Sequence, residues 1–375
     1  MVYLDYSATT PVNDEVLESF NKACKNFVGN SNSLHKLGTN INNLINTATE
    51  QIKDILNIND NKEIIYTSGS SEANNMAIKG IALKYSNRGK HIITSKYEHS
   101  SVIEPLKYLE SIGFEITYVD TDENGIININ NLEKIIRDDT ILVSINAVNS
   151  EIGLKQSIEE IGTVLKKYPK CFYHVDLTQA IGKINVNFEN IDLASFSAHK
   201  IYGIKGIGCL VKNKNIDLLP LIHGGKSTTK YRSGTPAHPL IVSFSKAIRL
   251  VCNNIDNNYN YILNINNFIK KSLLKYSKVF INSNDFCIPH ILNISVCGVR
   301  AETFMRALEK YDIYVSTKTA CSDENNISEN VYDLTNDVER AKSSIRISLS
   351  YLTTEEEVNY LLDCFDKCYK EFNVK

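Results

Sequence analysis

The feature that most constrains the fold is the alternation of β-rich and helical segments between residues 60 and 212. Runs rich in β-branched and aromatic residues occur at 63–68, 91–95, 114–119, 140–146, 171–176, 192–197 and 206–211. Helical patterns begin near residues 71, 101, 131 and 158, between the first five runs. Such alternation predicts βαβ units, and therefore a mostly parallel sheet with helices on both faces. Ligands of open α/β sheets bind at the carboxyl ends of the strands.

The pattern changes beyond about residue 255. A long polar helix is followed by a β-rich run at 290–296, a helix from Ala301, a second β-rich run at 343–350 and an amphipathic helix from Thr353. This order predicts a smaller α+β domain. We expect a large domain over 14–254 and a small domain made of 1–13 and 255–375, with the N-terminal arm packed on the latter.

Composition limits the class of partner. The 375 residues are 43% hydrophobic and 22% charged, and 41 Lys and Arg balance 43 Asp and Glu, which is typical of a soluble globular protein without nucleic-acid partners. No run of eighteen apolar residues occurs and the first residues lack a leader pattern, so we expect a cytoplasmic protein that binds no membrane. Nine cysteines without CxxC or Cys/His spacing predict neither a disulfide framework nor a metal site.

The segment "TSGSSEANN" at 67–75 follows a strand and opens a helix with one glycine and several hydroxyl residues. Free N–H groups at a helix start, together with hydroxyls and a glycine, can bind a phosphate. The alternative is an ordinary helix cap at Ser71, with Gly69 in the turn. The spacing of a nucleotide-binding P-loop is absent, so a nucleotide is not implied.

Two neighbouring strand ends carry an acid and a lysine. Asp176 directly follows an apolar strand, and Lys200 follows "SFSAH" and precedes Gly203, Gly206 and Gly208, which would permit a tight turn. Taken singly, Asp176 is equally well a helix cap, and a lysine after a strand is usually surface charge. An acid that faces a lysine across a phosphate site indicates pyridoxal phosphate, with Lys200 as the amine that reacts with its aldehyde.

In these motifs the sequence resembles the pyridoxal-phosphate-dependent cysteine desulfurases of iron–sulfur cluster and nitrogen-fixation type, within the fold-type I, class V aminotransferase superfamily. The similarity runs nearly end to end, through "YLDYSATTPV", "TSGSSEANNMAIKG", "HIITSKYEHSSV", "TILVSINAVNSEIG", "YHVDLTQAIGK", "SFSAHKIYGIKGIG", "RSGT", "TACS" and "SSIRISLS". The resemblance implies an α/β fold-type I transferase, with a mostly parallel seven-stranded sheet in the large domain plus the smaller α+β domain.

The resemblance also assigns the residues that hold the cofactor. Lys200 is the imine lysine, Asp176 keeps the pyridine nitrogen protonated, and Gln179 meets the ring hydroxyl. His99 stacks on the ring and moves protons, although by composition alone it is a helix-start or packing residue. The phosphate contacts are Gly69, Ser70, Ser71, Ser197 and His199, with Thr235 supplied by the second subunit of a homodimer.

Substrate residues follow from the same resemblance. Arg346 holds the substrate carboxylate as a bidentate pair, and the alternative is a surface arginine on an edge strand. Asn149 and Ser150 assist it. Cys321 lies among small and polar residues that predict an exposed loop, where a thiol can react. It is the expected nucleophile, which takes sulfur from L-cysteine, releases alanine and passes the persulfide sulfur to an acceptor or iron–sulfur scaffold protein.

Four positions depart from the family pattern. Ser150 replaces an asparagine, Ile204 replaces a proline, Lys226 lies in a segment that replaces a glycine run, and Lys318 stands where glycine or serine is usual. They indicate a divergent member. Beside a cysteine desulfurase, three other functions stay open. They are a selenocysteine lyase or another class V enzyme, a non-catalytic partner protein that keeps the fold, which the departures suggest, and, more weakly, a phosphate-binding module.

Overall fold

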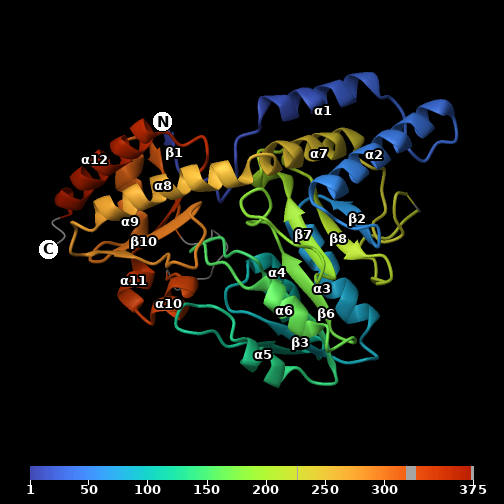
Figure 1. Ribbon diagram of the computed structural model, residues 1–375, viewed down its shortest axis with the longest axis horizontal. Helices are drawn as coiled ribbons and strands as arrows, with labels where there is room; N and C mark the ends of the chain where they lie inside the picture. Colours follow the sequence, from blue (N-terminus) through green and yellow to red (C-terminus); the bar gives the residue numbers. More distant parts are fainter. Residues whose placement is uncertain (226, 318–326, 373–375) are drawn as a thin grey trace.

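A computed structural model describes residues 1–225, 227–317 and 327–372 of the chain. Its larger sheet has seven strands in the order β2-β8-β7-β6-β5-β3-β4 (Figure 1). The strands are β2 (Lys62–Thr67), β3 (His91–Thr94), β4 (Glu115–Tyr118), β5 (Thr140–Asn146), β6 (Phe172–Asp176), β7 (Leu193–Ser197) and β8 (Gly208–Asn213). Only β8 runs antiparallel to its neighbours, so the prediction of a mostly parallel sheet is confirmed.

Helices cover both faces of this sheet, as expected. They are α1 (Asp14–Asn26), α2 (Lys36–Ile55), α3 (Ser70–Lys84), α4 (Ser100–Ser111), α5 (Ile129–Ile135), α6 (Ile158–Leu165) and α7 (His238–Cys252). Successive strand residues point to opposite faces. Thus Ile92, Leu142 and Leu210 join the hydrophobic cluster under α3 and α4. Their neighbours Ile93, Val143 and Val211 join the cluster under α2, α6 and α7. The strands are apolar at both alternations because both faces are buried.

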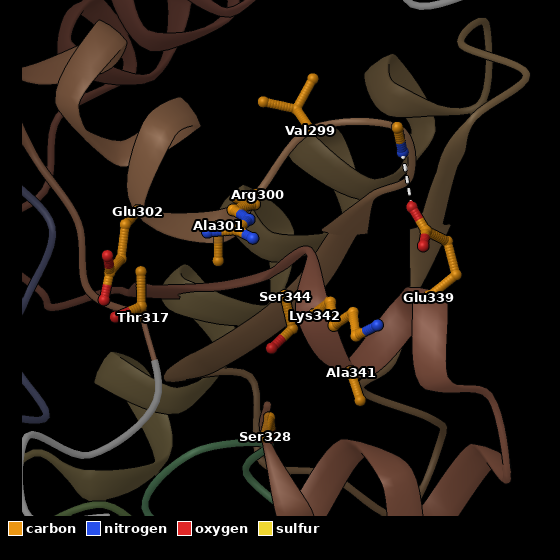
Figure 2. A pocket seen from close by; sticks show the side chains of 11 residues that line it. Val299, Arg300, Ala301, Glu302, Thr317, Ser328, Glu339, Ala341, Lys342 and Ser344 are labelled. Carbon is orange, nitrogen blue, oxygen red and sulfur yellow. Dashed lines mark hydrogen bonds between the residues drawn. The ribbon is translucent and has the colours of Figure 1, made fainter. Parts of the chain in front are cut away.

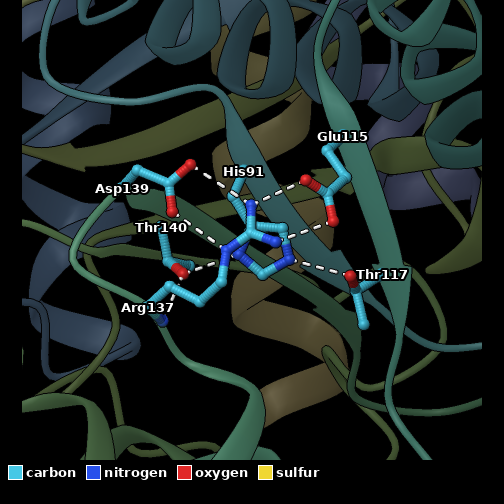
Figure 3. A network of polar contacts seen from close by, with 6 residues as sticks. All are labelled: His91, Glu115, Thr117, Arg137, Asp139 and Thr140. Carbon is cyan, nitrogen blue, oxygen red and sulfur yellow. Dashed lines mark hydrogen bonds and ion pairs between the residues drawn. The ribbon is translucent and has the colours of Figure 1, made fainter.

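A polar network fixes the strand register at the amino ends of β3, β4 and β5 (Figure 3). Arg137 forms two hydrogen bonds of 2.7 and 2.8 Å to Glu115 and a third of 2.9 Å to Asp139. The buried His91 ring meets the hydroxyls of Thr140 at 2.7 Å and Thr117 at 2.8 Å. This network thus ties together the amino ends of the three strands.

The C-terminal part has its own core. Its three-stranded antiparallel sheet, in the order β12-β10-β9, is formed by β9 (Val279–Ile281), β10 (Ile291–Val296) and β12 (Ser344–Ser348). The helices are α8 (Ile255–Leu273), α9 (Ala301–Glu309), α10 (Glu329–Thr335), α11 (Val338–Lys342) and α12 (Glu355–Glu371). The predicted start of the last helix at Thr353 is two residues early, because Thr354 and Glu357 form a capping box there.

The N-terminal arm packs on this second core, as expected. Strand β1 (Val2–Tyr3) pairs in parallel with β11 (Ile313–Tyr314), and Val2 and Leu4 belong to the C-terminal hydrophobic cluster. The smaller α+β arrangement is therefore confirmed, whereas the exact domain boundaries stay a prediction. Among the described residues, no helix has the length and apolarity needed to cross a membrane.

Candidate active site

A cavity of about 400 Å³ opens where the carboxyl ends of β5, β6 and β7 meet the N-terminal arm and β12. It contains most of the residues that the sequence predicted for the site. Those along its wall are Ser70, Ser71, His99, Ser150, Asp176, Gln179, His199, Lys200 and Arg346. Segments from both sheets therefore build one site.

Lys200 ends a short 3-10 helix (Ala198–Lys200) that continues directly from β7. Its Nζ donates hydrogen bonds to the carbonyl oxygens of Ser7, at 2.5 Å, and Ala8, at 2.7 Å. Burial lowers the pKa of Lys200 to about 8, and the charge of Arg346 acts in the same direction. The amine is thus much closer to losing its proton at neutral pH than a surface lysine.

A second partly buried lysine, which the sequence reasoning missed, lies next to the cavity-lining Gln179. Burial lowers the pKa of Lys183 to about 7. Its Nζ donates to Gln179 Oε1, while Gln179 Nε2 donates to the Ser7 carbonyl at 3.0 Å. Lys183 therefore fixes which end of the Gln179 amide faces the N-terminal arm, and it is not among the cavity-lining residues.

Asp176 is the last residue of β6 and is buried. Its Oδ1 accepts the Thr178 N–H at 2.9 Å. Turns and no helix follow β6, so the helix-cap alternative for Asp176 is wrong. Its Oδ2 accepts from Asn74 Nδ2 at 2.8 Å. Asn74 is held in turn by the Ser101 and Ser195 hydroxyls. Asn74 was missed, although an asparagine on the apolar side of a helix is a signal for a buried polar contact.

The start of α3 is open in the way that an anion site requires. Its N-cap is Gly69 and has no side-chain cap, so the alternative of a cap at Ser71 is wrong. The Ser70 N–H donates to Ser197 Oγ at 2.6 Å, which ties the turn to β7. Ser197 thus supports the cradle from behind and is not a lining residue.

Two of the glycines after Lys200 are required for different structural reasons. Gly206 has φ of +93°, which explains why β8 begins two residues later than the predicted β-rich run. A Cβ on Gly208 would lie 2.6 Å from the Phe196 carbonyl oxygen and 2.8 Å from Gly69 Cα. Gly208 therefore allows β8 to approach the cradle, a role different from the turn expected for it.

His99 is the N-cap of α4, because its Nδ1 accepts the Ser101 N–H at 3.1 Å. The helix-start reading is thus confirmed, and the same ring also lines the cavity. Burial of the imidazole ring lowers the pKa of His99, because desolvation disfavours its charged form.

Arg346 lies on the central residue of β12 and is 3% exposed, so a surface role is wrong. Its Nη1 donates to the Ser150 carbonyl at 2.9 Å. Its Nη2 donates to Asp5 Oδ1 at 2.6 Å. Ser150 thus contributes its backbone oxygen to the site, a contact for which the side chain does not matter.

Three predicted positions lie away from this cavity or outside the described residues. Asn149 is buried, accepts the Glu151 and Ile152 N–H groups within its own turn, and donates to the Tyr97 carbonyl at 2.8 Å, so it ties this turn to the segment before His99. Thr235 is exposed, and its hydroxyl accepts from Asn30 at 3.5 Å. Cys321 falls outside the described residues, as do Lys226 and Lys318.

A second cavity of about 320 Å³ lies in the C-terminal part, between the start of α9 and α11 (Figure 2). One wall is fixed by Glu339, whose Oε1 accepts the Gly298 N–H at 3.0 Å. Among the described residues, none that the sequence predicted for the site lines it. The first cavity is therefore the candidate active site.

A family model for class-V aminotransferases matches residues 2–361. The chain belongs to this family, whose members are pyridoxal-phosphate-dependent enzymes. Within it, the chain is 39% identical over 371 residues to "Cysteine desulfurase IscS" of Dictyoglomus turgidum, which covers 98% of this chain and 94% of the relative. The fold of this chain matches that of a solved "NifS-like protein" with a TM-score of 0.91 and 34% identity, over 99% of both chains. It also matches a structure named "SspA in complex with cysteine", with a TM-score of 0.82 and 33% identity, over 94% of this chain and 100% of that one.

Proposed function

We propose that this protein is a cysteine desulfurase that uses pyridoxal 5'-phosphate bound at Lys200. The observation that carries the proposal is that Lys200, Asp176, Arg346 and the open start of α3 line one cavity. Support comes from the desulfurase relatives and from the SspA structure, which is described as a complex with cysteine.

The residues of the cavity fit this cofactor. A lysine with a pKa of about 8 suits attachment to an aldehyde. The buried Asp176 suits a protonated ring nitrogen, and the N–H groups that follow Ser70 at the start of α3 suit a phosphate. When bound, the cofactor supplies an electron-withdrawing ring next to the substrate's α-carbon.

The chain's own groups divide the remaining work. Arg346 binds the substrate carboxylate, which sets the orientation of the amino acid in the cavity. Lys200, once free, takes the α-proton, because a lowered pKa makes its neutral form available. His99, at the cavity wall, moves protons between solvent and the reacting atoms.

Cys321 completes the reaction. Its thiolate attacks the sulfur of the bound cysteine, the bond between that sulfur and the β-carbon breaks, and the carbon side gains protons to leave as L-alanine. The enzyme keeps the sulfur as a persulfide on Cys321. We infer that the persulfide sulfur then passes to an acceptor protein for iron–sulfur cluster or other thio-cofactor assembly.

The test is to incubate the holoprotein with L-cysteine and a reductant and to measure sulfide and alanine together. We expect equal amounts of both, and a loss of sulfide release in Cys321→Ala. Cys24→Ala is the matched control, because Cys24 is an exposed cysteine on α1, away from the cavity. Full turnover by Cys321→Ala with an amino donor and a keto acid would instead identify an aminotransferase.

The same assay distinguishes a desulfurase from a selenocysteine lyase and from a non-catalytic protein. Higher turnover with selenocysteine than with cysteine would identify a selenocysteine lyase. A protein that stays colourless with added pyridoxal phosphate would be a non-catalytic partner. We further propose a homodimer located in the cytoplasm, in which Thr235 of one subunit contacts the phosphate held by the other.

A further inference from the structure

The guanidinium of Arg346 is bound unevenly in the free protein. Nη1 and Nη2 each have an acceptor, the Ser150 carbonyl and Asp5 Oδ1. Nε is buried and has no hydrogen-bond partner among the described residues. Nε and Nη2 form one edge of the guanidinium, and a carboxylate that binds this edge with both oxygens satisfies both donors. Asp5 therefore occupies half of the edge and leaves the other half unsatisfied.

Asp5 is held in this position by the N-terminal arm. Its backbone forms a parallel bridge with Ser348 of β12, and its carbonyl accepts the Ala8 N–H at 2.9 Å. The Asp5 side chain keeps 21% of its exposure, against 4% for Arg346. The acid is thus the partner of the pair that borders solvent, whereas the arginine is almost fully covered.

The turn at 5–8 also contacts the other groups of the site. The carbonyls of Ser7 and Ala8 accept from Lys200, and the Ser7 carbonyl accepts from Gln179. One short segment of the arm therefore satisfies three polar side chains of the ligand-free cavity. Asp5 is the member that does so with a charge.

From these contacts we propose that Asp5 is an internal competitor for the substrate carboxylate. It neutralises Arg346 in the free protein and must give up Nη2 when an α-amino acid binds. Two carboxylates on one edge repel each other, so the exchange lowers the affinity for the amino acid. This inference rests on the proposed function, because it takes Arg346 as the carboxylate site.

The test is an equilibrium titration of the holoprotein with L-alanine, followed by the absorbance of the bound coenzyme. Asp5→Asn keeps the shape and removes the charge, and we expect its Kd for L-alanine to fall roughly tenfold. Asp5→Ser should change the Kd in the same direction. Ethylamine, which is L-alanine without the carboxylate, should bind the wild type and the variants within about twofold, since it does not need Arg346.

Asp363→Asn is the matched control, because it removes one exposed negative charge from α12, away from the cavity. An unchanged or increased Kd for L-alanine in Asp5→Asn would overturn the proposal, since Asp5 would then be neutral or would help to orient Arg346. An equal gain for ethylamine would overturn it as well, because the effect would not concern the carboxylate.

Arg346→Lys separates this proposal from the proposed function. It removes the two-donor edge, so L-alanine binding should weaken by about tenfold or more, and Asp5→Asn should then have no further effect. If Arg346→Lys leaves the L-alanine affinity unchanged, the proposed substrate site is wrong. If Arg346→Lys weakens binding but Asp5→Asn alone does nothing, only the role of Asp5 is wrong.

Discussion

At the scale of single residues, two partly buried lysines with lowered pKa values, Lys200 and Lys183, lie in or next to the site. Their chemistry alone does not decide which one holds the cofactor. Position does, because Lys200 lines the cavity whereas Lys183 is bound to Gln179 and does not line it. The assignment of Lys200 therefore depends on geometry, with the pKa shift as a supporting fact.

The first prediction concerns the pH dependence of cofactor uptake by the apoprotein. Only the neutral amine attacks an aldehyde. Because burial lowers the pKa of Lys200 to about 8, half of the Lys200 side chains are neutral near pH 8. The rate of uptake, followed by coenzyme absorbance, should rise through pH 8 and level off above it. A midpoint about two units higher, near the ordinary pKa of a lysine, would contradict the burial argument.

The second prediction concerns Asp176→Asn. The amide keeps the shape but removes the charge that faces the ring nitrogen, so the cofactor loses most of its power to withdraw electrons. We expect bound coenzyme but a fall in alanine formation of about 100-fold or more. Asp122→Asn, in an exposed turn, is the control. Equal rates for Asp176→Asn and wild type would exclude the assigned role.

Some residues could be predicted from sequence and others could not, for a physical reason. Asp176 and Lys200 follow strands, and strand ends converge at one edge of a parallel sheet. Asp5 contacts Arg346, which lies 341 positions further along the chain, and Asn74 contacts Asp176, which lies 102 positions further. No local pattern encodes such pairs. Lys183 was missed because sequence does not reveal that a lysine four residues after Gln179 is partly buried and donates to it.

At the scale of elements, the most demanding contact is the one between β8 and the turn before α3. The third prediction is that Gly208→Ala destabilises the protein by about 1–3 kcal/mol, because its Cβ would overlap backbone atoms of Phe196 and Gly69. Coenzyme affinity should fall with it, since the cradle must move. Gly225→Ala is the control, because a Cβ there would have no atom within 4 Å. Denaturant titration and coenzyme binding measure the two effects, and equal values for both variants would contradict this account.

The strands of the large sheet and the helices between them were predictable, since helix and strand periods are local properties of the sequence. Helices α1, α2 and α7, which lie outside that alternating stretch, were not predicted. Within the stretch, the errors occurred at the ends of the elements. Ser71 resembles a helix cap, but the chain enters α3 through Gly69, whose packing on Gly208 is a tertiary contact. Close packing against β8 therefore places Gly69 at the N-cap of α3, where local sequence preference favours Ser71.

At the scale of the whole molecule, the proposed dimer gives the fourth prediction. If Thr235 serves the partner's site, Thr235→Ala should weaken coenzyme binding roughly tenfold, as expected for a lost hydrogen bond to a charged phosphate. Mixed dimers of Thr235→Ala with Lys200→Ala should each regain one tight site, made of Lys200 from one chain and Thr235 from the other. Absence of this recovery, in mixtures shown to exchange subunits, would exclude a shared site.

The joining of the two cores could not be predicted in detail. The sequence indicates two sheets, yet Arg346 of β12 reaches the Ser150 carbonyl near β5. The N-terminal arm contacts both cores, through Ser348 of β12 and through Lys200 after β7. These contacts depend on how the cores dock. The active site is thus a property of the assembled molecule, and the family pattern indicated it where periodicity alone could not.

The most direct test of the central claim is to reduce the holoprotein with borohydride, digest it and locate the coenzyme by mass spectrometry. Our account predicts that the peptide containing Lys200 carries the added mass. Attachment to Lys183, which is partly buried and also has a lowered pKa, to any other lysine, or to no lysine at all, would contradict it.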